Sequence, residues 1–188
     1  MVDVKAQFKK EVSNLKDYIV LIKVGAKDYQ NTNVAVLKSL VSDQKTPGIY
    51  VTLNKPFEVM ERLLKKNNID SRLIIFIDAF TDIGEGKKRI KNCLYIGSPE
   101  KLSDISIAMD QAVKSLPTKE KFLFFDSINT LQVFNNPGTV MKFVHFLATK
   151  IREWKVKGII ILISSSADEP LTNELVQFCD AKIEARGA

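Results

Sequence analysis

The sequence has 188 residues, 45% of them apolar, which is enough for one well-buried core and short for two. We therefore expect a single domain over residues 1–188. A formal net charge of +6 favours acidic partners but is too low to indicate nucleic-acid binding by itself. No apolar run is long enough to cross a bilayer, and the charged opening residues exclude a signal peptide. Cys93 and Cys179 show neither metal-ligand spacing nor a disulfide framework, so we expect a soluble protein of the reducing cytoplasm.

Strands and helices alternate along the chain. Apolar stretches, in most cases continuous runs, predict strands of a buried parallel sheet at residues 18–24, 48–53, 73–78, 93–96, 122–126, 158–163 and 181–185. Apolar stripes at helical spacing predict helices at residues 4–15, from 32 up to the polar stretch 43–48, from 57 to 64, from 102 to 113, at 138–154 and at 171–178. The polar stretch 81–91 is the best candidate for a mobile loop. This alternation predicts a three-layer α/β domain with a mainly parallel central sheet.

A carboxylate closes the predicted strand 122–126. Ligands of open parallel α/β sheets bind at the carboxyl ends of the strands, so Asp126 is placed as a metal-orienting group would be in a phosphate-handling site. The other interpretation is that Asp126 caps the turn into the next helix. The strand 73–78 also ends in a carboxylate, Asp78.

The first strand, loop and helix have the layout of a phosphate-binding loop. With Gly25 in the first position of G-x-x-x-x-G-K-[ST], the second glycine is replaced by Gln30 and the lysine by Asn31, whereas the hydroxyl is kept as Thr32. The second glycine allows the backbone to point amides at phosphate, and the lysine supplies positive charge. Losing one such charged contact costs about 1.5–3 kcal/mol. We expect no bound cofactor, or Mg–ATP binding that is weak at most.

Four segments, in the order in which they occur, carry a resemblance to a known fold. They are GIYVTLNKPFEVMERLL at 48–64, IIFIDAF at 74–80, FLFFDSINTL at 122–131 and GIIILISS at 158–165. Over essentially its whole length the chain resembles RecA-fold ATPases of the P-loop NTPase type, closest to the KaiC and RadA proteins found widely in archaea. The resemblance implies a RecA-like domain in which Asp126 occupies the Walker B position that helps to hold magnesium.

The same resemblance implies a water-activating glutamate just after the strand 48–53, where this sequence has Asn54. An amide cannot accept a proton from attacking water, and removing a general base typically costs ~10²–10⁴-fold in rate. We therefore expect no catalytic residue. The positions of a degenerate nucleotide site are Gly25, Gln30, Asn31, Thr32, Asn54 and Asp126.

Three other features have ordinary structural explanations. The basic run Lys87-Lys88-Arg89 with Lys91 lacks interleaved aromatic residues and is typical of a solvated loop. His145 has no second histidine or cysteine at metal-ligand spacing, so no metal site is expected. The serines 164–166 follow a strand that carries a phosphate-sensing polar residue in the family, although serines at strand ends commonly satisfy backbone groups.

The preferred hypothesis is a catalytically inactive KaiC-like protein that works as a regulatory or assembly partner, either of an active RecA-like relative or of other copies of itself. One alternative is a residual nucleotide-binding protein in which Thr32 and Asp126 still hold Mg–nucleotide. Another is a nucleic-acid-binding RecA-like module that uses the basic run at 87–91, for which steeply salt-dependent binding would be the sign. We expect no membrane partner.

Overall fold

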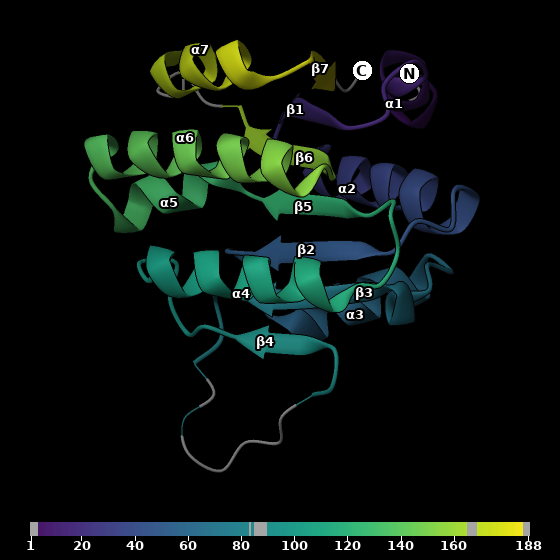
Figure 1. Ribbon diagram of the computed structural model, residues 1–188, viewed down its shortest axis with the longest axis horizontal. Helices are drawn as coiled ribbons and strands as arrows, with labels where there is room; N and C mark the ends of the chain where they lie inside the picture. The colour runs from purple at the N-terminus through teal and green to yellow at the C-terminus, as the bar shows by residue number, and fades with distance from the viewer. Residues whose placement is uncertain (1–3, 83, 85–89, 165–168, 186–188) are drawn as a thin grey trace.

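The computed structural model describes residues 4–82, 84, 90–164 and 169–185. Seven strands form one sheet in the order β4-β3-β2-β5-β6-β1-β7, which Figure 1 shows stacked from bottom to top. The strands are β1 (Tyr18–Val24), β2 (Gly48–Thr52), β3 (Ile74–Asp78), β4 (Cys93–Tyr95), β5 (Phe122–Asp126), β6 (Lys157–Ile163) and β7 (Ala181–Ala185). All six neighbouring pairs are parallel, so the predicted fold class is confirmed.

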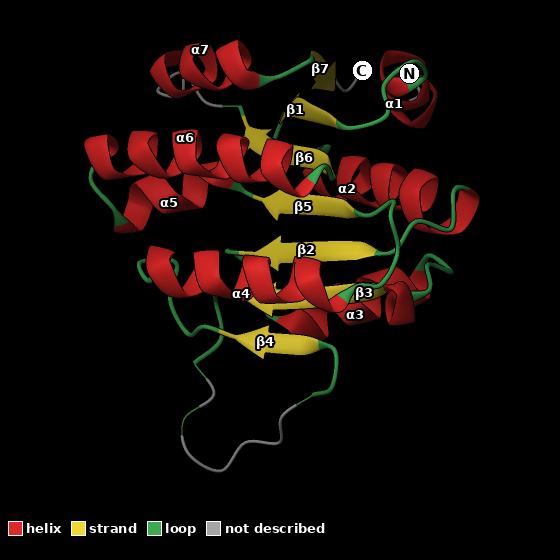
Figure 2. Cartoon of the chain, viewed as in Figure 1, coloured by secondary structure: helices red, strands yellow, loops and turns green. Residues whose placement is uncertain are grey.

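Helices cover both faces of the sheet (Figure 2). They are α1 (Val4–Val12), α2 (Tyr29–Leu37), α3 (Phe57–Lys66), α4 (Leu102–Ser115), α5 (Ile128–Phe134), α6 (Pro137–Trp154) and α7 (Glu169–Phe178), with a π-helical turn η1 (Lys38–Asp43) and a 3-10 turn η2 (Ser71–Leu73). None of the helices in the described part of the chain is long and apolar enough to span a membrane.

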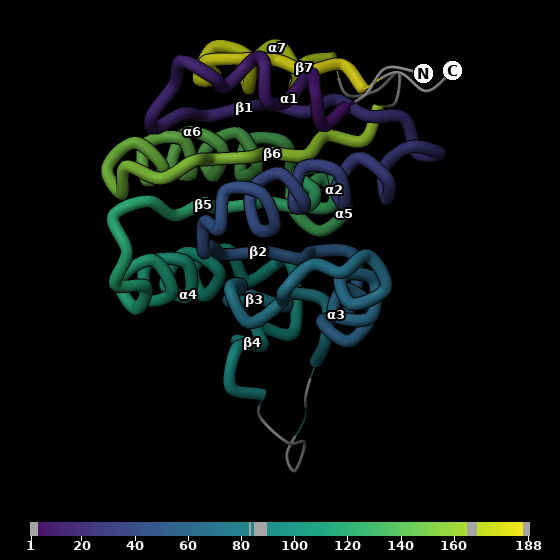
Figure 3. The backbone as a smooth tube through the Cα atoms, turned by 90° about the vertical axis from the view of Figure 1, so that its right-hand side faces the viewer, coloured from purple at the N-terminus to yellow at the C-terminus, as the bar shows by residue number. Residues whose placement is uncertain are grey.

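Two apolar clusters, one on each face, hold the three layers together. One joins the sheet to α1, α2 and α3, and the other joins it to α4, α5, α6 and α7. In Figure 3, where the molecule is turned by 90°, α2 and α3 lie on one side of the sheet and α4 and α6 on the other. The central strands β2 and β5 are buried along their whole length, which explains why their sequences are apolar without alternation.

Helix α1 ends at Val12 rather than at residue 15, and two further helices differ from the sequence prediction. α2 begins at Tyr29 rather than Thr32, so the β1–α2 connection is only the four residues 25–28. The amide of Thr32 already donates to the carbonyl of Asp28 (2.9 Å), which makes Tyr29 part of the first helical turn. The helix α5 was not predicted, because its seven residues bury only Ile128 and Leu131 and so show no helical period.

Candidate functional site

Asp126 lies at the carboxyl end of β5, in register with Thr52 of the neighbouring strand β2. Its side chain leaves the sheet on the same face as Phe124, because strand residues alternate between faces and the two positions are two apart. That face is the one covered by α2. The carboxylate is fully buried, with no exposed surface at all. It therefore lies beneath α2 and has no contact with solvent.

Two side chains of α2 bind this carboxylate. The Tyr29 hydroxyl is 2.6 Å from each carboxylate oxygen, and the Asn33 side-chain amide donates to Oδ2 at 3.0 Å. Tyr29 and Asn33 are four positions apart, a spacing that puts both side chains on one face of a helix. The first turn of α2 is thereby fixed to the end of β5.

A third donor comes from β2. The Tyr50 hydroxyl donates to Oδ2 of Asp126 and also accepts from the Asn33 amide at 3.3 Å. The Tyr50 ring stacks on Phe124, with centroids 4.9 Å apart, so packing within the sheet holds the hydroxyl in position. We call Asp126 with Tyr29, Asn33 and Tyr50 the Asp126 network; it joins α2, β2 and β5.

The loop after β2 closes over Tyr29. Asn54 lies within hydrogen-bond distance of the Tyr29 hydroxyl through both its Nδ2 (3.1 Å) and its Oδ1 (3.3 Å). The Lys55 ammonium lies 4.7 Å from the centroid of the Tyr29 ring, a cation–π distance. The Thr52 hydroxyl donates to the Lys55 carbonyl at 2.6 Å, which fixes this turn. Asn54 and Lys55, in the loop after β2, therefore cover the network from outside.

Burial dominates the electrostatics of this network. It raises the pKa of Asp126 above its usual range, and the hydrogen bonds from Tyr29 and Tyr50 oppose that rise. The pKa values of both tyrosine hydroxyls are also raised, first by burial and then by the neighbouring carboxylate. The hydroxyls consequently stay protonated and remain donors.

These residues do not fit a magnesium–nucleotide complex. Metal coordination needs an oxygen lone pair that is accessible from the ligand side, whereas both oxygens of Asp126 already accept hydrogen bonds and neither is exposed. The Tyr29 hydroxyl lies against both of these oxygens, at 2.6 Å. The carboxylate therefore has no oxygen turned toward a bound nucleotide.

The other positions of the predicted nucleotide site do not converge on Asp126. Gln30 and Asn31 are exposed side chains of the first turn of α2, and Gly25 is in the short turn before it. Thr32 is 1% exposed, and its hydroxyl has no hydrogen-bond partner among the described residues. Of the five predicted site positions other than Asp126, only Asn54 is hydrogen-bonded to the Asp126 network, and its partner there is the Tyr29 hydroxyl.

Asp78, at the end of β3, is a second fully buried carboxylate. It accepts hydrogen bonds from the backbone amides of Phe57, Phe80 and Thr81, each at 2.8 Å, and from the Thr81 hydroxyl at 2.7 Å. The amide of Phe57 is the first of α3, so Asp78 satisfies a helix terminus from a neighbouring strand. Its role is structural.

Of the remaining predicted features, His145 and the two cysteines are described by the structure and have no hydrogen bond to the Asp126 network among the described residues. His145 bonds Glu174 at 2.8 Å and packs edge-on against Phe178 on the outer side of α6. Within the described residues no group of histidines, cysteines and carboxylates could hold a metal ion. Both cysteines are free thiols. The basic run 87–89, most of the loop 83–89 and the serines 165–166 lie outside the described residues, while Ser164 is exposed at the end of β6.

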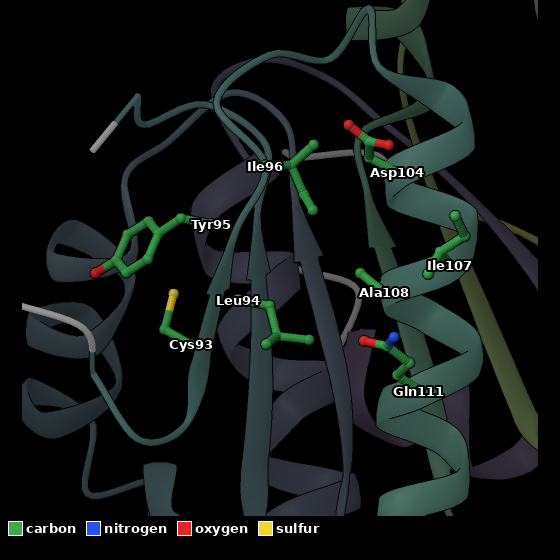
Figure 4. A pocket seen from close by; sticks show the side chains of 8 residues that line it. All are labelled: Cys93, Leu94, Tyr95, Ile96, Asp104, Ile107, Ala108 and Gln111. Atoms are coloured by element: carbon green, nitrogen blue, oxygen red, sulfur yellow. The ribbon is translucent and has the colours of Figure 1, made fainter. Parts of the chain in front are cut away.

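A cavity of about 340 Å³ lies between the edge strand β4 and helix α4. Figure 4 shows Leu94 of β4 and Ile96, the residue after this strand, turned toward α4, where Ala108 and Gln111 face them, whereas Tyr95 points to the other side of the strand. Ile107 of α4 is 57% exposed at its rim. Strand and helix residues that form a groove have no shared sequence pattern, so this groove could not be predicted from the sequence.

Tyr29, Asn33 and Tyr50 were not among the predicted site residues. Tyr29 precedes the helix predicted from residue 32, and Tyr50 lies inside the strand predicted at 48–53. One signal was present: with the helix started at residue 29, Tyr29 and Asn33 share the face that carries Val36 and Leu37 toward the sheet. A polar pair on a buried helix face predicts a buried polar partner.

Comparisons with known proteins agree with this fold. The model of a family described as "Family of unknown function (DUF7504)" matches residues 51–185. No curated protein matches the sequence. Among solved structures, a KaiC-like protein, PH0186 from Pyrococcus horikoshii OT3, superimposes with a TM-score of 0.57 at 15% identity. That match covers 78% of this chain, which spans only 61% of the KaiC-like protein.

Two other proteins of Pyrococcus horikoshii match over more of their length. PH0250 has a TM-score of 0.64 at 13% identity, with 97% of this chain and 87% of that one covered. PH0321, an uncharacterised protein determined in complex with an unknown peptide, has a TM-score of 0.72 at 12% identity and covers 97% and 83%. At these identities the similarity concerns the fold, and it confirms the resemblance to KaiC-like RecA-fold proteins.

Proposed function

The chain belongs to the DUF7504 family, whose description names no function, and we propose that it is a catalytically inactive RecA-fold protein that acts by binding another protein. The observation that carries this proposal is the state of Asp126. In the RecA-like resemblance this carboxylate would orient magnesium, but here its oxygens are bound by Tyr29, Tyr50 and Asn33 beneath α2. Asp126 stabilises the fold by joining α2, β2 and β5 and does not bind a metal ion.

The substitutions at the motif positions give a second argument, because each of them acts against nucleotide binding or hydrolysis. Gln30 and Asn31 stand in place of the glycine and the lysine of the phosphate loop, Asn54 stands in place of the general base, and the Tyr29 hydroxyl is hydrogen-bonded to the carboxylate at the Walker B position. A RecA-fold protein that binds no nucleotide acts through its surface, by binding another protein. The partner is an active RecA-like protein or another copy of this chain, so the role is regulation or assembly.

Calorimetric titration of Mg–ATP into the purified protein, with an assay of phosphate release, tests the loss of catalysis. We expect a Kd weaker than about 1 mM, equivalent to no more than ~4 kcal/mol of binding free energy, and no hydrolysis. Micromolar binding would contradict the proposal and favour the alternative in which Thr32 and Asp126 hold nucleotide.

A double variant sharpens this test. Gln30→Gly with Asn31→Lys restores the two lost motif residues, but both positions are exposed on a helix that has already begun at Tyr29. We expect no gain in Mg–ATP affinity from the double variant. A tenfold gain, about 1.4 kcal/mol, would show that the first turn of α2 can open into a phosphate loop.

Peptide binding at β4 is a second candidate function. It is favoured because β4 is the outermost strand at one edge of the sheet. The Ile96 amide donates to the Asp78 carbonyl (2.8 Å), and the Phe76 amide donates to the Asn92 carbonyl (2.8 Å), so the inner side of β4 is paired. By alternation the Tyr95 amide points outward, where the strand order ends. An extended peptide of a partner protein could add there as an eighth strand and place side chains in the groove beside α4. The related fold of PH0321 was determined with a peptide.

A display library of random short peptides tests this candidate. We expect enrichment of alternating apolar sequences on the wild-type protein, with loss of that enrichment in Tyr95→Pro, which removes the outward amide. Leu94→Asp should have the same effect, because Leu94 lines the groove. Val133→Asp is the matched control, since Val133 is 78% exposed on α5. Absence of enrichment, or enrichment unaffected by Tyr95→Pro, would contradict it.

A further inference from the structure

A smaller cavity of about 220 Å³ lies at the amino ends of the strands. Asp126 lies at the other end of the strands. Tyr18 opens β1 and Lys157 opens β6, and the two are register partners on neighbouring parallel strands, so their side chains leave the same face. The end of α1 supplies Lys9 and Ser13, and the residue after η1, Gln44, completes the polar lining. Three chain segments far apart in sequence thus bring polar side chains together.

The Tyr18 hydroxyl has no hydrogen-bond partner among the described residues, although the side chain is only 1% exposed. Its ring is fixed by an edge-on contact with Phe8 of α1, with centroids 6.4 Å apart. A buried hydroxyl without a partner loses about 1–3 kcal/mol relative to one that is hydrogen-bonded. Most buried polar groups in proteins are paired, so this hydroxyl indicates a ligand that the cavity accepts.

The charges around the cavity indicate the sign of that ligand. Lys9 and Lys5 share one carboxylate, Asp43, at 2.6 and 2.9 Å. Lys157 bonds Glu120 at 3.0 Å and the side-chain oxygen of Gln44 at 3.1 Å, and its side chain is only 13% exposed. Lys9 and Lys157 are the charged side chains among the described residues that line the cavity, whereas the carboxylates that they bind, Asp43 and Glu120, are not part of the lining, so the lining itself is positive.

The volume of the cavity and its hydrogen-bond donors limit the class of ligand that it could bind. The cavity is below the ~300–1,000 Å³ typical of sites for drug-sized ligands, so it suits a small ion rather than a nucleotide. The Tyr18 phenol hydroxyl and the ammonium groups of Lys9 and Lys157 are able to donate hydrogen bonds to oxygen, whereas the Ser13 hydroxyl already donates to the Lys10 carbonyl (2.9 Å). We propose that this cavity binds a small oxyanion, phosphate or a phosphomonoester, through Tyr18, Lys157 and Lys9. Such a site is independent of the Asp126 network and of the proposed function.

The test is calorimetric titration of inorganic phosphate into the whole protein at constant ionic strength. We expect saturable binding of one phosphate per chain with a Kd below about 1 mM. Tyr18→Phe should weaken binding about 3–10-fold, the effect of one neutral hydrogen bond, and Lys157→Met about 10–100-fold, the effect of a charged one. Lys142→Met is the matched control, because it removes the same charge from the exposed side of α6, and it should change the Kd less than twofold.

Two results would overturn the proposal. One is the absence of saturable binding to the wild-type protein. The other is equal affinity of wild type and Tyr18→Phe, which would mean that water alone satisfies the hydroxyl. Since Phe keeps the packing against Phe8, this variant should fold even if Lys157→Met does not. A parallel titration with glycerol 3-phosphate separates the sources: tighter binding than inorganic phosphate identifies a phosphomonoester, and weaker binding identifies free phosphate.

Discussion

The hydroxyl of Tyr29 lies 2.6 Å from both carboxylate oxygens of Asp126, although the two residues are 97 positions apart in the sequence. A phenol has one proton to donate, so it serves one oxygen at a time, while Tyr50 and Asn33 serve Oδ2. This contact replaces the solvent that an ionised carboxylate needs, and it does so with groups that belong to the protein itself. Stability, rather than turnover, should therefore depend on it.

Replacing Tyr29 with Phe tests this dependence. The variant keeps the ring but leaves the buried carboxylate with one donor fewer, so we expect a loss of about 1–3 kcal/mol in the free energy of unfolding. For a chain of this size that is a fall of roughly 2–12 °C in Tm. Tyr18→Phe, measured in phosphate-free buffer, is the control, because its hydroxyl has no partner among the described residues. Equal losses in the two variants would mean that the hydrogen bond contributes nothing.

The pH dependence of stability follows from the raised pKa of Asp126, whose cause is burial. In an unfolded chain an aspartate titrates near 3.9, so the folded state favours the protonated form over a wider pH range. That contribution is complete below the unfolded pKa and is lost as the pH rises through the folded pKa. Asp126→Asn is neutral throughout and should therefore gain stability relative to wild type as the pH rises above about 4.

Urea unfolding of wild type and Asp126→Asn from pH 4 to 8 measures this difference. Its slope should not exceed about 1.4 kcal/mol per pH unit, the value for one proton. Surface carboxylates whose pKa is lowered, such as Asp70 beside Arg72, are present in both proteins, and their effects cancel in the difference. A difference that stays constant from pH 4 to 8 would show that Asp126 titrates alike in the folded and unfolded chains.

Asp78 should be the more costly of the two buried carboxylates to remove. Asp78→Ala leaves three backbone amides and the Thr81 hydroxyl without their acceptor, so we expect a loss of about 2–4 kcal/mol, measured by urea unfolding. Asp70→Ala is the control, because Asp70 is exposed and accepts only from Arg72. A small effect of Asp78→Ala would mean that water reaches the start of α3.

Two glycines should respond in opposite ways to alanine. At Gly48, the first residue of β2, an added Cβ would lie 2.4 Å from the ring of Phe122, so Gly48→Ala should lower stability by about 1–3 kcal/mol. At Gly138, in the first turn of α6, the nearest atom is the Asn136 side-chain oxygen at 3.6 Å. Gly138→Ala should raise stability by up to ~1 kcal/mol. Thermal unfolding of both variants checks the prediction, and a stable Gly48→Ala would mean that the Phe122 ring can move aside.

The sequence was sufficient to predict the strands, and the reason is physical. The inner strands of a sheet that is covered on both faces are apolar at nearly every position, and that composition is visible in the sequence of each strand alone. Asp126 was found in the same way, as the first charge after such a run. Its donors could not be found, because Tyr50 reads as a β-forming aromatic and Tyr29 as a turn residue until packing brings them together. The first turn of α2 could not be predicted either, since Asp28 makes no side-chain cap bond that would mark the start of the helix.

The position of β1 in the sheet has a consequence for synthesis on the ribosome. Although β1 is the first strand of the chain, both of its neighbours, β6 and β7, come after residue 156. Its backbone groups therefore stay unpaired through most of translation, while β2, β3, β4 and β5 can already associate. Contacts of such large sequence separation slow folding and leave apolar strands exposed in intermediates. The nascent protein should accordingly depend on chaperones until residues 157–185, which form β6 and β7, have left the exit tunnel.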